Sequence, residues 1–280
     1  MKTIKLFVIL LISLGFTAQA QDLYHVTRVS GKVTNLKTGQ EIVAGDALNP
    51  SDQLLFESID SYAIAIGSNM GRFQLKIREE EGKGMQQMLT ATVVESAKPT
   101  SMRNLMMARF NPNEKEISDL KQYFGNDKFS IIGDGVNIPL NQQTYPLSDE
   151  KFIVFFYRVD NNPVQKKIGF DEQQLLLEKE KLVTSSVGQI TGNEIANLQV
   201  YEYESTTRTG KEITRFTLVF VDKESLKNEF YTIIPILKRQ RMADTDIKKY
   251  LIEYYYDFYG ATDSKTIDLF AEEIVKNYTL

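Results

Sequence analysis

The chain has 280 residues, and its 33 basic and 37 acidic side chains give a formal net charge of −4 at pH 7. This acidic balance disfavours nucleic acid and anionic membranes as main partners. The chain has no cysteine, which excludes disulfide bonds, thiolate catalysis, cysteine-ligated zinc and a lipid anchor on an N-terminal cysteine. A chain of this length can bury more than one hydrophobic core, so we expect two domains.

Residues 1–20 have the features of a cleaved signal peptide. A start with two lysines precedes an almost entirely apolar run from Leu6 to Phe16, and the small residues Ala18 and Ala20 follow it. A membrane anchor is the alternative, but a spanning helix needs roughly 20 apolar residues. We therefore expect cleavage before Gln21, export to the periplasm and no membrane span after cleavage.

Residues 21–95 show the pattern of short strands and turns that is typical of a small β domain. In the stretch 71–78 the apolar residues Phe73, Leu75 and Ile77 alternate with polar ones, the period of a strand covered on one face. The stretch 62–66, YAIAI, also alternates, and GSNMG joins the two as a hairpin. Strands this short close best into a small barrel or sandwich, because closure removes exposed edges.

A succession of strands and turns runs through this domain: Val-Ser-Gly-Lys-Val, Gly45-Asp46 before Leu48, a turn at Ser51-Asp52, QLLFES, then Ser61-Tyr62-Ala63. From Val26 to Ile77 the chain resembles the FecR-like β domain of bacterial envelope proteins. The resemblance implies a non-catalytic periplasmic module linked to sensing or to contacts with other envelope proteins. The FecR sensor has a cytoplasmic segment and a transmembrane helix where this chain has a signal peptide, so direct regulation of a sigma factor does not follow.

The glycines and aspartates of this stretch are interpreted as turn residues. Gly31 and Gly45 suit backbone turns with positive φ, and Asp46 and Asp52 can accept hydrogen bonds from nearby backbone amides. The alternative is a cation site shared by the two carboxylates, but their spacing matches no recognised calcium loop. We expect no metal and no cofactor.

Residues 96–112 are expected to connect the two domains, with Leu105, Met106 and Met107 able to dock the segment against either one. Residues 113–280 mix helices with longer strands, which indicates an α+β domain with helices packed on a mostly antiparallel sheet. Its first helix is predicted to start at a cap, Asn111 or Asn113, and to stop at Gly125.

Two hairpins are predicted after this helix, with turns at residues 160–163 and at Thr209-Gly210. In the last strand Ile213 and Phe216 are out of step with each other, which indicates a bulge or a late strand start. Three helices are predicted to follow. Asp222 can cap the first, which should end or kink before Pro235. The second is rich in tyrosine and stops at Gly260, and the last covers residues 264–278.

The tyrosine-rich helix supplies the first candidate partner-binding residues. Its stretch YYYDFY places aromatic rings on more than one helical face, so we expect at least one of Tyr255, Tyr256 and Tyr259 to be exposed and to contact a partner. The alternative is that Tyr254, Tyr255 and Phe258 pack inside while the others lie on the surface. Carbohydrate stacking is less attractive because the chain has no tryptophan.

The second candidate is the basic run just before this helix. Lys238, Arg239 and Arg241 stand close together in an acidic chain. A run of this kind is either a solvated loop or a contact for an acidic partner or phosphate groups.

Catalytic motifs are not evident. His25 is the only histidine, and no serine nucleophile elbow, Walker loop or HExxH helix is present. The competing class is a periplasmic hydrolase acting through paired carboxylates such as Asp134 or Glu202. We favour an exported, non-catalytic binding or scaffold protein of a bacterial envelope complex, with an envelope protein as its partner.

Overall fold

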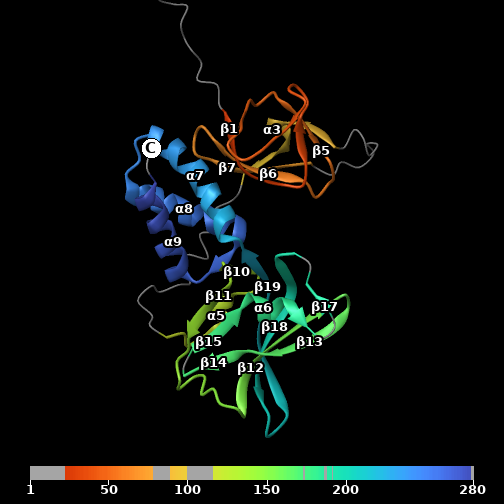
Figure 1. Cartoon of the computed structure of the whole chain (residues 1–280), viewed down its shortest axis with the longest axis vertical. Helices are drawn as coiled ribbons and strands as arrows, with labels where there is room; N and C mark the ends of the chain where they lie inside the picture. Colours follow the sequence, from red (N-terminus) through yellow and green to blue (C-terminus); the bar gives the residue numbers. More distant parts are fainter. Residues whose placement is uncertain are drawn as a thin grey trace, which may run out of the picture. The chain divides into compact units, whose positions relative to one another are not determined.

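A computed structural model of the chain describes residues 23–77, 89–99, 116–172, 174–185, 188–190 and 192–278. The predicted signal peptide, the caps Asn111 and Asn113 and most of the connecting segment lie outside these residues. The chain divides into two compact units, residues 1–99 and 100–280, and Figure 1 shows strands in the first and strands with helices in the second. The predicted α+β fold with two domains is confirmed.

The first unit consists of two antiparallel sheets. A five-stranded sheet has the order β4-β1-β6-β7-β9 and a four-stranded sheet the order β3-β2-β5-β8. The elements are β1 (Tyr24–Ser30), β2 (Val33–Asn35), β3 (Gln40–Glu41), β4 (Ala47–Leu48), β5 (Gln53–Phe56), β6 (Tyr62–Gly67), β7 (Arg72–Lys76), β8 (Thr90–Thr92), α3 (Val93–Ser96) and β9 (Ala97–Pro99). Strand β9 pairs with β7, so the sheet continues past residue 95.

The strands form because alternate residues enter one apolar core. In β5, Leu54 and Phe56 are fully buried while their neighbours are exposed, and they join Val33, Ala63 and Leu75 in the core cluster. The predicted hairpin is present: β6 and β7 pair in antiparallel register, and the Gly67 amide donates to the Gly71 carbonyl at 2.9 Å.

The turn roles predicted for the aspartates and glycines are confirmed. Asp46 Oδ2 accepts from the Val43 amide at 2.8 Å, and Asp52 Oδ2 accepts from the Asn49 amide at 2.9 Å. Gly31 has φ +70°, and a Cβ there would lie 2.5 Å from Ser61 Oγ. These residues therefore build the scaffold of the unit.

The second unit is organised around a six-stranded sheet of order β13-β12-β18-β19-β10-β20. β10 runs parallel to β19 and β20, and the other neighbours are antiparallel. Its strands are β10 (Lys128–Ile132), β12 (Lys151–Val159), β13 (Asn162–Lys167), β18 (Glu194–Glu204), β19 (Thr209–Val221) and β20 (Ala261–Thr262). A three-stranded sheet has the order β11-β15-β14, with β11 (Gly135–Pro139), β14 (Gly169–Asp171) and β15 (Gln174–Glu178). A two-stranded sheet pairs β16 (Thr184–Ser185) with β17 (Gly188–Gln189).

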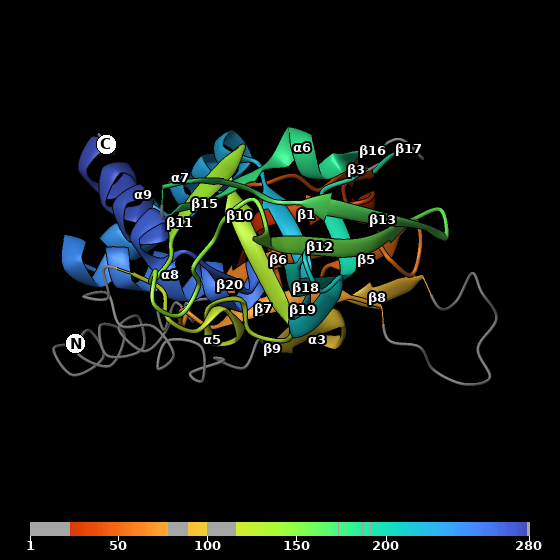
Figure 2. The ribbon, with the colours of Figure 1, turned by 90° about the horizontal axis from the view of Figure 1, so that it is seen from below.

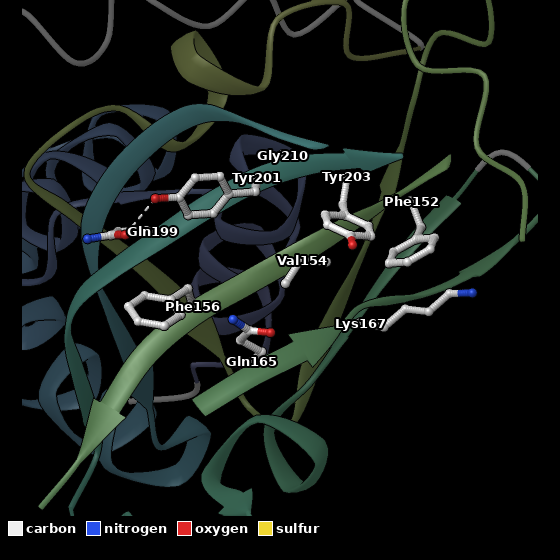
Figure 3. Close-up of a pocket in the computed structure, with 9 residues that line it drawn as sticks. All are labelled: Phe152, Val154, Phe156, Gln165, Lys167, Gln199, Tyr201, Tyr203 and Gly210. Carbon is white, nitrogen blue, oxygen red and sulfur yellow. Dashed lines mark hydrogen bonds between the residues drawn. The ribbon is translucent and has the colours of Figure 1, made fainter. Parts of the chain in front are cut away.

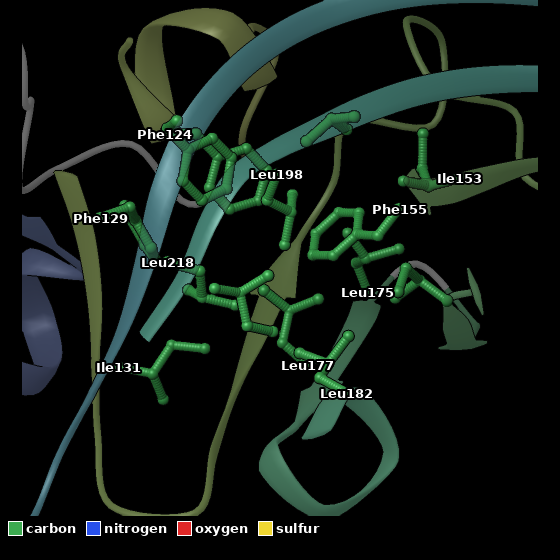
Figure 4. Close-up of a cluster of buried hydrophobic side chains, with 14 of the residues drawn as sticks. Phe124, Phe129, Ile131, Ile153, Phe155, Leu175, Leu177, Leu182, Leu198 and Leu218 are labelled. Atoms are coloured by element: carbon green, nitrogen blue, oxygen red, sulfur yellow. The ribbon is translucent and has the colours of Figure 1, made fainter. Parts of the chain in front are cut away.

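Aromatic rings fill the core behind this sheet. Phe124 stacks on Phe216 with centroids 4.8 Å apart, and Phe129 and Phe155 meet Phe124 edge to face. Figure 4 shows Phe124, Phe129 and Phe155 with leucines from β15, β18 and β19. The short helix α6 (Lys179–Val183) adds Leu182 to the same cluster.

The first predicted helix is shorter than expected. α5 spans Leu120–Phe124, and its cap is Asp119, whose Oδ1 accepts from the Gln122 amide at 2.9 Å. Ile117 instead forms a parallel bridge with Leu140, which gives its backbone a strand partner in place of a helical turn. The predicted stop at Gly125 is confirmed by its φ of +71°.

Both hairpins of the second unit are present, but the predicted turn at Thr209-Gly210 is wrong. β18 ends at Glu204 and β19 begins at Thr209, so residues 205–208 form the turn, with the positive φ supplied by Arg208. The β12–β13 turn contains Asp160 and Asn161, each with positive φ. The β18–β19 pairing passes from Thr214 directly to Glu212 opposite consecutive residues of β18, so Ile213 is the bulge that explains the loss of alternation.

Three long helices complete the unit: α7 (Lys223–Arg239), α8 (Asp244–Tyr259) and α9 (Ser264–Asn277). Figure 2 shows them grouped beside β10 and β20. Asp222 caps α7 as predicted. Of the two outcomes predicted at Pro235, an end or a kink, the end does not occur, because α7 continues through the proline to Arg239.

Candidate functional site

The structure buries two of the three tyrosines predicted to bind a partner. Tyr255 is 0% exposed, with its hydroxyl 2.7 Å from Ser130 Oγ of β10. Tyr259 is 8% exposed and donates to Glu229 Oε1 of α7 at 2.5 Å. Tyr256 is half-buried. None of the three is largely exposed, so the expectation of an exposed ring among them is wrong.

The physical reason is that α8 has neighbours on several sides. Tyr255 contacts β10, while Tyr254 and Tyr259 both donate to Glu229 of α7. Rings on different faces of α8 are therefore buried against different elements, whereas the prediction assumed that only one face of the helix would be buried. Burial raises the pKa of Tyr256 to about 12, with smaller contributions from Asp263 and Asp268.

The basic run occupies the end of α7 and the turn after it. Lys238 and Arg239 lie in the last helical turn, so the expected loop begins only after them. Arg239 and Arg241 are exposed and Lys238 is half-buried. Cations at a helix C-terminus also favour the helix because they face its negative end.

Two tyrosines that sequence reasoning missed extend this run into a surface. Lys238 Nζ lies 5.3 Å from the Tyr278 ring centroid, and the rings of Tyr278 and Tyr231 are 5.5 Å apart. Lys227 Nζ lies 5.8 Å from the Tyr231 centroid. We call the set Lys227, Tyr231, Lys238, Arg239, Arg241 and Tyr278 the basic–aromatic surface. The signal was the spacing of Lys227, Tyr231 and Lys238, which share a helical face.

The cationic end of this surface has no counter-charge within the part of the chain that the structure describes. Among the described residues, no carboxylate lies within ion-pairing distance of Lys238, Arg239 or Arg241. By contrast, Lys227 pairs with Glu224 at 3.5 Å and Lys248 pairs with Asp268 at 2.9 Å. The arrangement can therefore attract an anionic group without first breaking an ion pair.

A second feature is a hollow of about 560 Å³ on the outer face of the six-stranded sheet. In β12, Ile153, Phe155 and Tyr157 enter the core, so Phe152 and Val154 face the opposite way. Figure 3 shows the lining side chains across four strands. The lining residues are Phe152, Val154, Phe156, Gln165, Lys167, Gln199, Tyr201, Tyr203 and Gly210, and we call this site the sheet hollow.

The strand register explains the shape of the sheet hollow. Phe152 lies opposite Tyr203, and Val154 lies opposite Tyr201. Gly210 is the partner of Tyr203 on the next strand, so no side chain fills that position. Figure 3 places Val154 between the Phe156 and Tyr201 rings on one side and the Phe152 and Tyr203 rings on the other.

The candidate catalytic residues are not brought together. Asp134 lies in the turn between β10 and β11, and Glu202 on β18 pairs with Lys151 at 3.0 Å. Neither lines the sheet hollow or a second hollow, of about 590 Å³, between β13 and α6. His25 lies on β1. The part of the chain that the structure describes contains no group of three side chains suited to hold a metal ion.

In that same part of the chain, every helix is too short or too polar to span a membrane. A scan against protein-family models and a search of curated proteins found no match to this chain.

Proposed function

We propose that this chain is an exported, non-catalytic binding or scaffold protein of a bacterial envelope complex. The observation that carries the proposal is the basic–aromatic surface at the end of α7. It presents cations that have no carboxylate partner among the described residues, on a chain whose net charge is −4. The partner that fits this surface is an acidic face of another envelope protein.

The composition of the surface supports a protein partner. Arginine and tyrosine are enriched among the residues that dominate binding energy at protein interfaces. Arg239 and Arg241 supply planar groups for bidentate contacts with carboxylates. Tyr231 and Tyr278 supply apolar ring surface beside Lys238, which a partner could cover together with the charged contacts.

The first unit fits the supporting role that a FecR-like module would have. Its core is formed by short antiparallel strands, and the aspartates of its turns are used by backbone amides. The signal-like residues 1–20 place both units in the periplasm under this proposal. A module of this kind would present the second unit within the envelope.

The proposal is tested by affinity capture from envelope extracts of the native host, with the tagged mature chain as bait. A double variant, Arg239→Glu and Arg241→Glu, reverses two charges of the surface. Its matched control is Lys249→Glu with Lys265→Glu, which makes the same charge change at exposed positions on α8 and α9.

We expect mass spectrometry to identify an acidic envelope protein that the wild type and the control retain and the double variant loses. Retention by all three baits would contradict the surface assigned here. Recovery from cells of only the uncleaved chain, with Met1 intact, would contradict export.

A further inference from the structure

We propose that the sheet hollow binds a neutral saccharide. This site lies on β12, β13, β18 and β19 and is built from residues that the basic–aromatic surface does not use. Its volume of about 560 Å³ lies in the range of small-ligand sites. Its chemistry combines flat aromatic surface with neutral hydrogen-bonding groups.

The aromatic rings provide stacking surfaces around an aliphatic floor. Phe152 and Tyr203 lie 5.4 Å apart and are tilted by 42°, and with Phe156 and Tyr201 they surround Val154 (Figure 3). The faces of aromatic rings are electron-rich, and the C–H groups on one face of a sugar ring are weakly positive. A sugar ring between these side chains would therefore contact rings and floor together.

The polar groups of the sheet hollow are mostly neutral donors and acceptors. Gln165 and Gln199 lie opposite Phe156 on its two neighbouring strands, and each amide can donate and accept. The Tyr201 hydroxyl lies 2.8 Å from Gln199 Oε1 and 3.0 Å from Glu212 Oε2. Burial and this carboxylate raise the pKa of Tyr201, so its single proton stays bound and is donated within the protein, and the hydroxyl oxygen can accept from a sugar hydroxyl.

The charges around the sheet hollow argue against an ionic ligand. Lys167 is its only charged lining residue among those described, and its Nζ lies 3.7 Å from Asp149 and 4.2 Å from the Phe152 centroid. Glu212, beside Tyr201, pairs with Arg215 at 3.4 Å. Each of these two charges already has an ion-pair partner, so an ionic ligand would compete with that partner.

Two other occupants fit less well. An acyl chain would cover the glutamine amides without replacing their hydrogen bonds to water, which costs free energy. An extended peptide binds best along an unpaired strand edge, but Val154 and Phe156 of β12 and Tyr201 and Tyr203 of β18, at the centre of the sheet hollow, have strand partners on both sides. A ligand on this face must therefore satisfy side chains, as a polyhydroxylated ring does.

The test is saturation-transfer difference NMR on the mature chain, with irradiation of the protein's high-field methyl protons, where neither the saccharides nor the tripeptides absorb. The probes are neutral trisaccharides of glucose, mannose, galactose and N-acetylglucosamine, with trigalacturonic acid as the anionic probe and Phe-containing tripeptides as the peptide probe. We expect transfer to at least one neutral trisaccharide and none to trigalacturonic acid.

Two variants probe the site from opposite directions. Tyr203→Ala removes a wall, and we expect affinity to fall about fivefold or more, since one stacking contact contributes about 1 kcal/mol. Gly210→Trp fills the hollow and should abolish transfer. A Cβ at Gly210 would meet Tyr203 and Tyr201 at ordinary distances of 3.5 and 3.6 Å, so this variant should fold. Tyr203→Phe keeps the ring and should bind within about twofold of the wild type.

Tyr231→Ala removes a ring from the basic–aromatic surface and should leave saccharide binding unchanged, so failures of the two proposed sites can be told apart. The saccharide proposal is overturned if no neutral trisaccharide receives transfer from folded protein. It is also overturned if Gly210→Trp binds like the wild type, or if only trigalacturonic acid or the tripeptides receive transfer.

Discussion

At the residue scale, Gly31 and Ser61 meet so closely that position 31 has no room for a side chain. Gly31 and Gly39 have nearly the same backbone angle, with φ of +70° and +69°. A Cβ at position 39 would meet nothing within 4 Å, whereas one at position 31 would lie 3.2 Å from the Ser61 backbone. Comparing Gly31 with Gly39 therefore separates the free-energy cost of a positive φ from the cost of the steric clash with Ser61.

We therefore predict that Gly39→Ala lowers the free energy of unfolding by about 1 kcal/mol, the cost of a left-handed angle for alanine. Gly31→Ala should lower it by an additional 1–3 kcal/mol, roughly the cost of overpacking. Urea denaturation measures both. Equal effects of the two substitutions would show that Ser61 moves away freely.

The tyrosines of α8 allow a second comparison between neighbouring residues. Tyr255→Phe removes a buried hydroxyl that meets Ser130 at 2.7 Å, and we expect a loss of about 1 kcal/mol in the free energy of unfolding. Tyr256→Phe changes a half-buried ring and should stay within about 0.5 kcal/mol. Thermal or urea unfolding that ranks them the other way would contradict the packing of α8 described above.

At the element scale, the start of α9 depends on one side chain. Asp263 Oδ1 accepts from the Thr266 amide at 2.8 Å, and its Oδ2 accepts from the Tyr123 hydroxyl at 3.3 Å. Asp263 therefore caps α9 and also ties it to α5.

Asp263→Ala should reduce stability by about 1–2 kcal/mol, because the cap is lost. Asp263→Asn retains a capping oxygen and should recover most of that loss. Asp268→Ala, at an exposed position of the same helix, is the control and should cost less than about 1 kcal/mol, as surface ion pairs do. Denaturant unfolding measures the free energy of unfolding of the three variants. A loss of stability in Asp263→Asn equal to that in Asp263→Ala would exclude the capping role.

Elements with strong local signals were predictable from the sequence. Asp222 caps α7, and Gly125 and Gly260 end their helices, because capping and positive φ are decided by the residue itself. The predicted first helix and the predicted exposed tyrosine failed because distant partners fix those residues. Ile117 is held by Pro139 and Asn141 through backbone bonds of 2.7 and 3.0 Å, and no local pattern reports those contacts.

The two proposed sites were harder to predict than the helices and strands, because they too depend on contacts between residues that are far apart in the chain. The run from Phe152 to Tyr157 is apolar on both of its faces, which was a visible sign of an uncovered aromatic face. Which residues surround this face depends on the strand order β13-β12-β18-β19, because that order brings together residues far apart in the chain. Tyr278 likewise joins Lys238 only through the packing of α9 beside α7.

At the scale of the whole molecule, the first unit is expected to fold alone. Strand β9 belongs to its larger sheet, so the fragment must include residues 97–99. We predict that residues 21–99 unfold cooperatively with β-type circular dichroism, whereas residues 21–95 unfold at a lower urea concentration. An unfolded 21–99 fragment would show that its sheets need the rest of the chain.

The central claim is that the cations at the end of α7 bind an acidic envelope partner. The most direct measurement is the dissociation constant of the purified mature chain for its captured partner, determined by calorimetry at two salt concentrations. We expect Arg239→Glu with Arg241→Glu to weaken binding by at least tenfold, about 1.4 kcal/mol, and higher salt to weaken the wild type. The Lys249→Glu with Lys265→Glu control should bind like the wild type. Equal dissociation constants for both double variants, or an affinity that does not depend on salt, would contradict the claim.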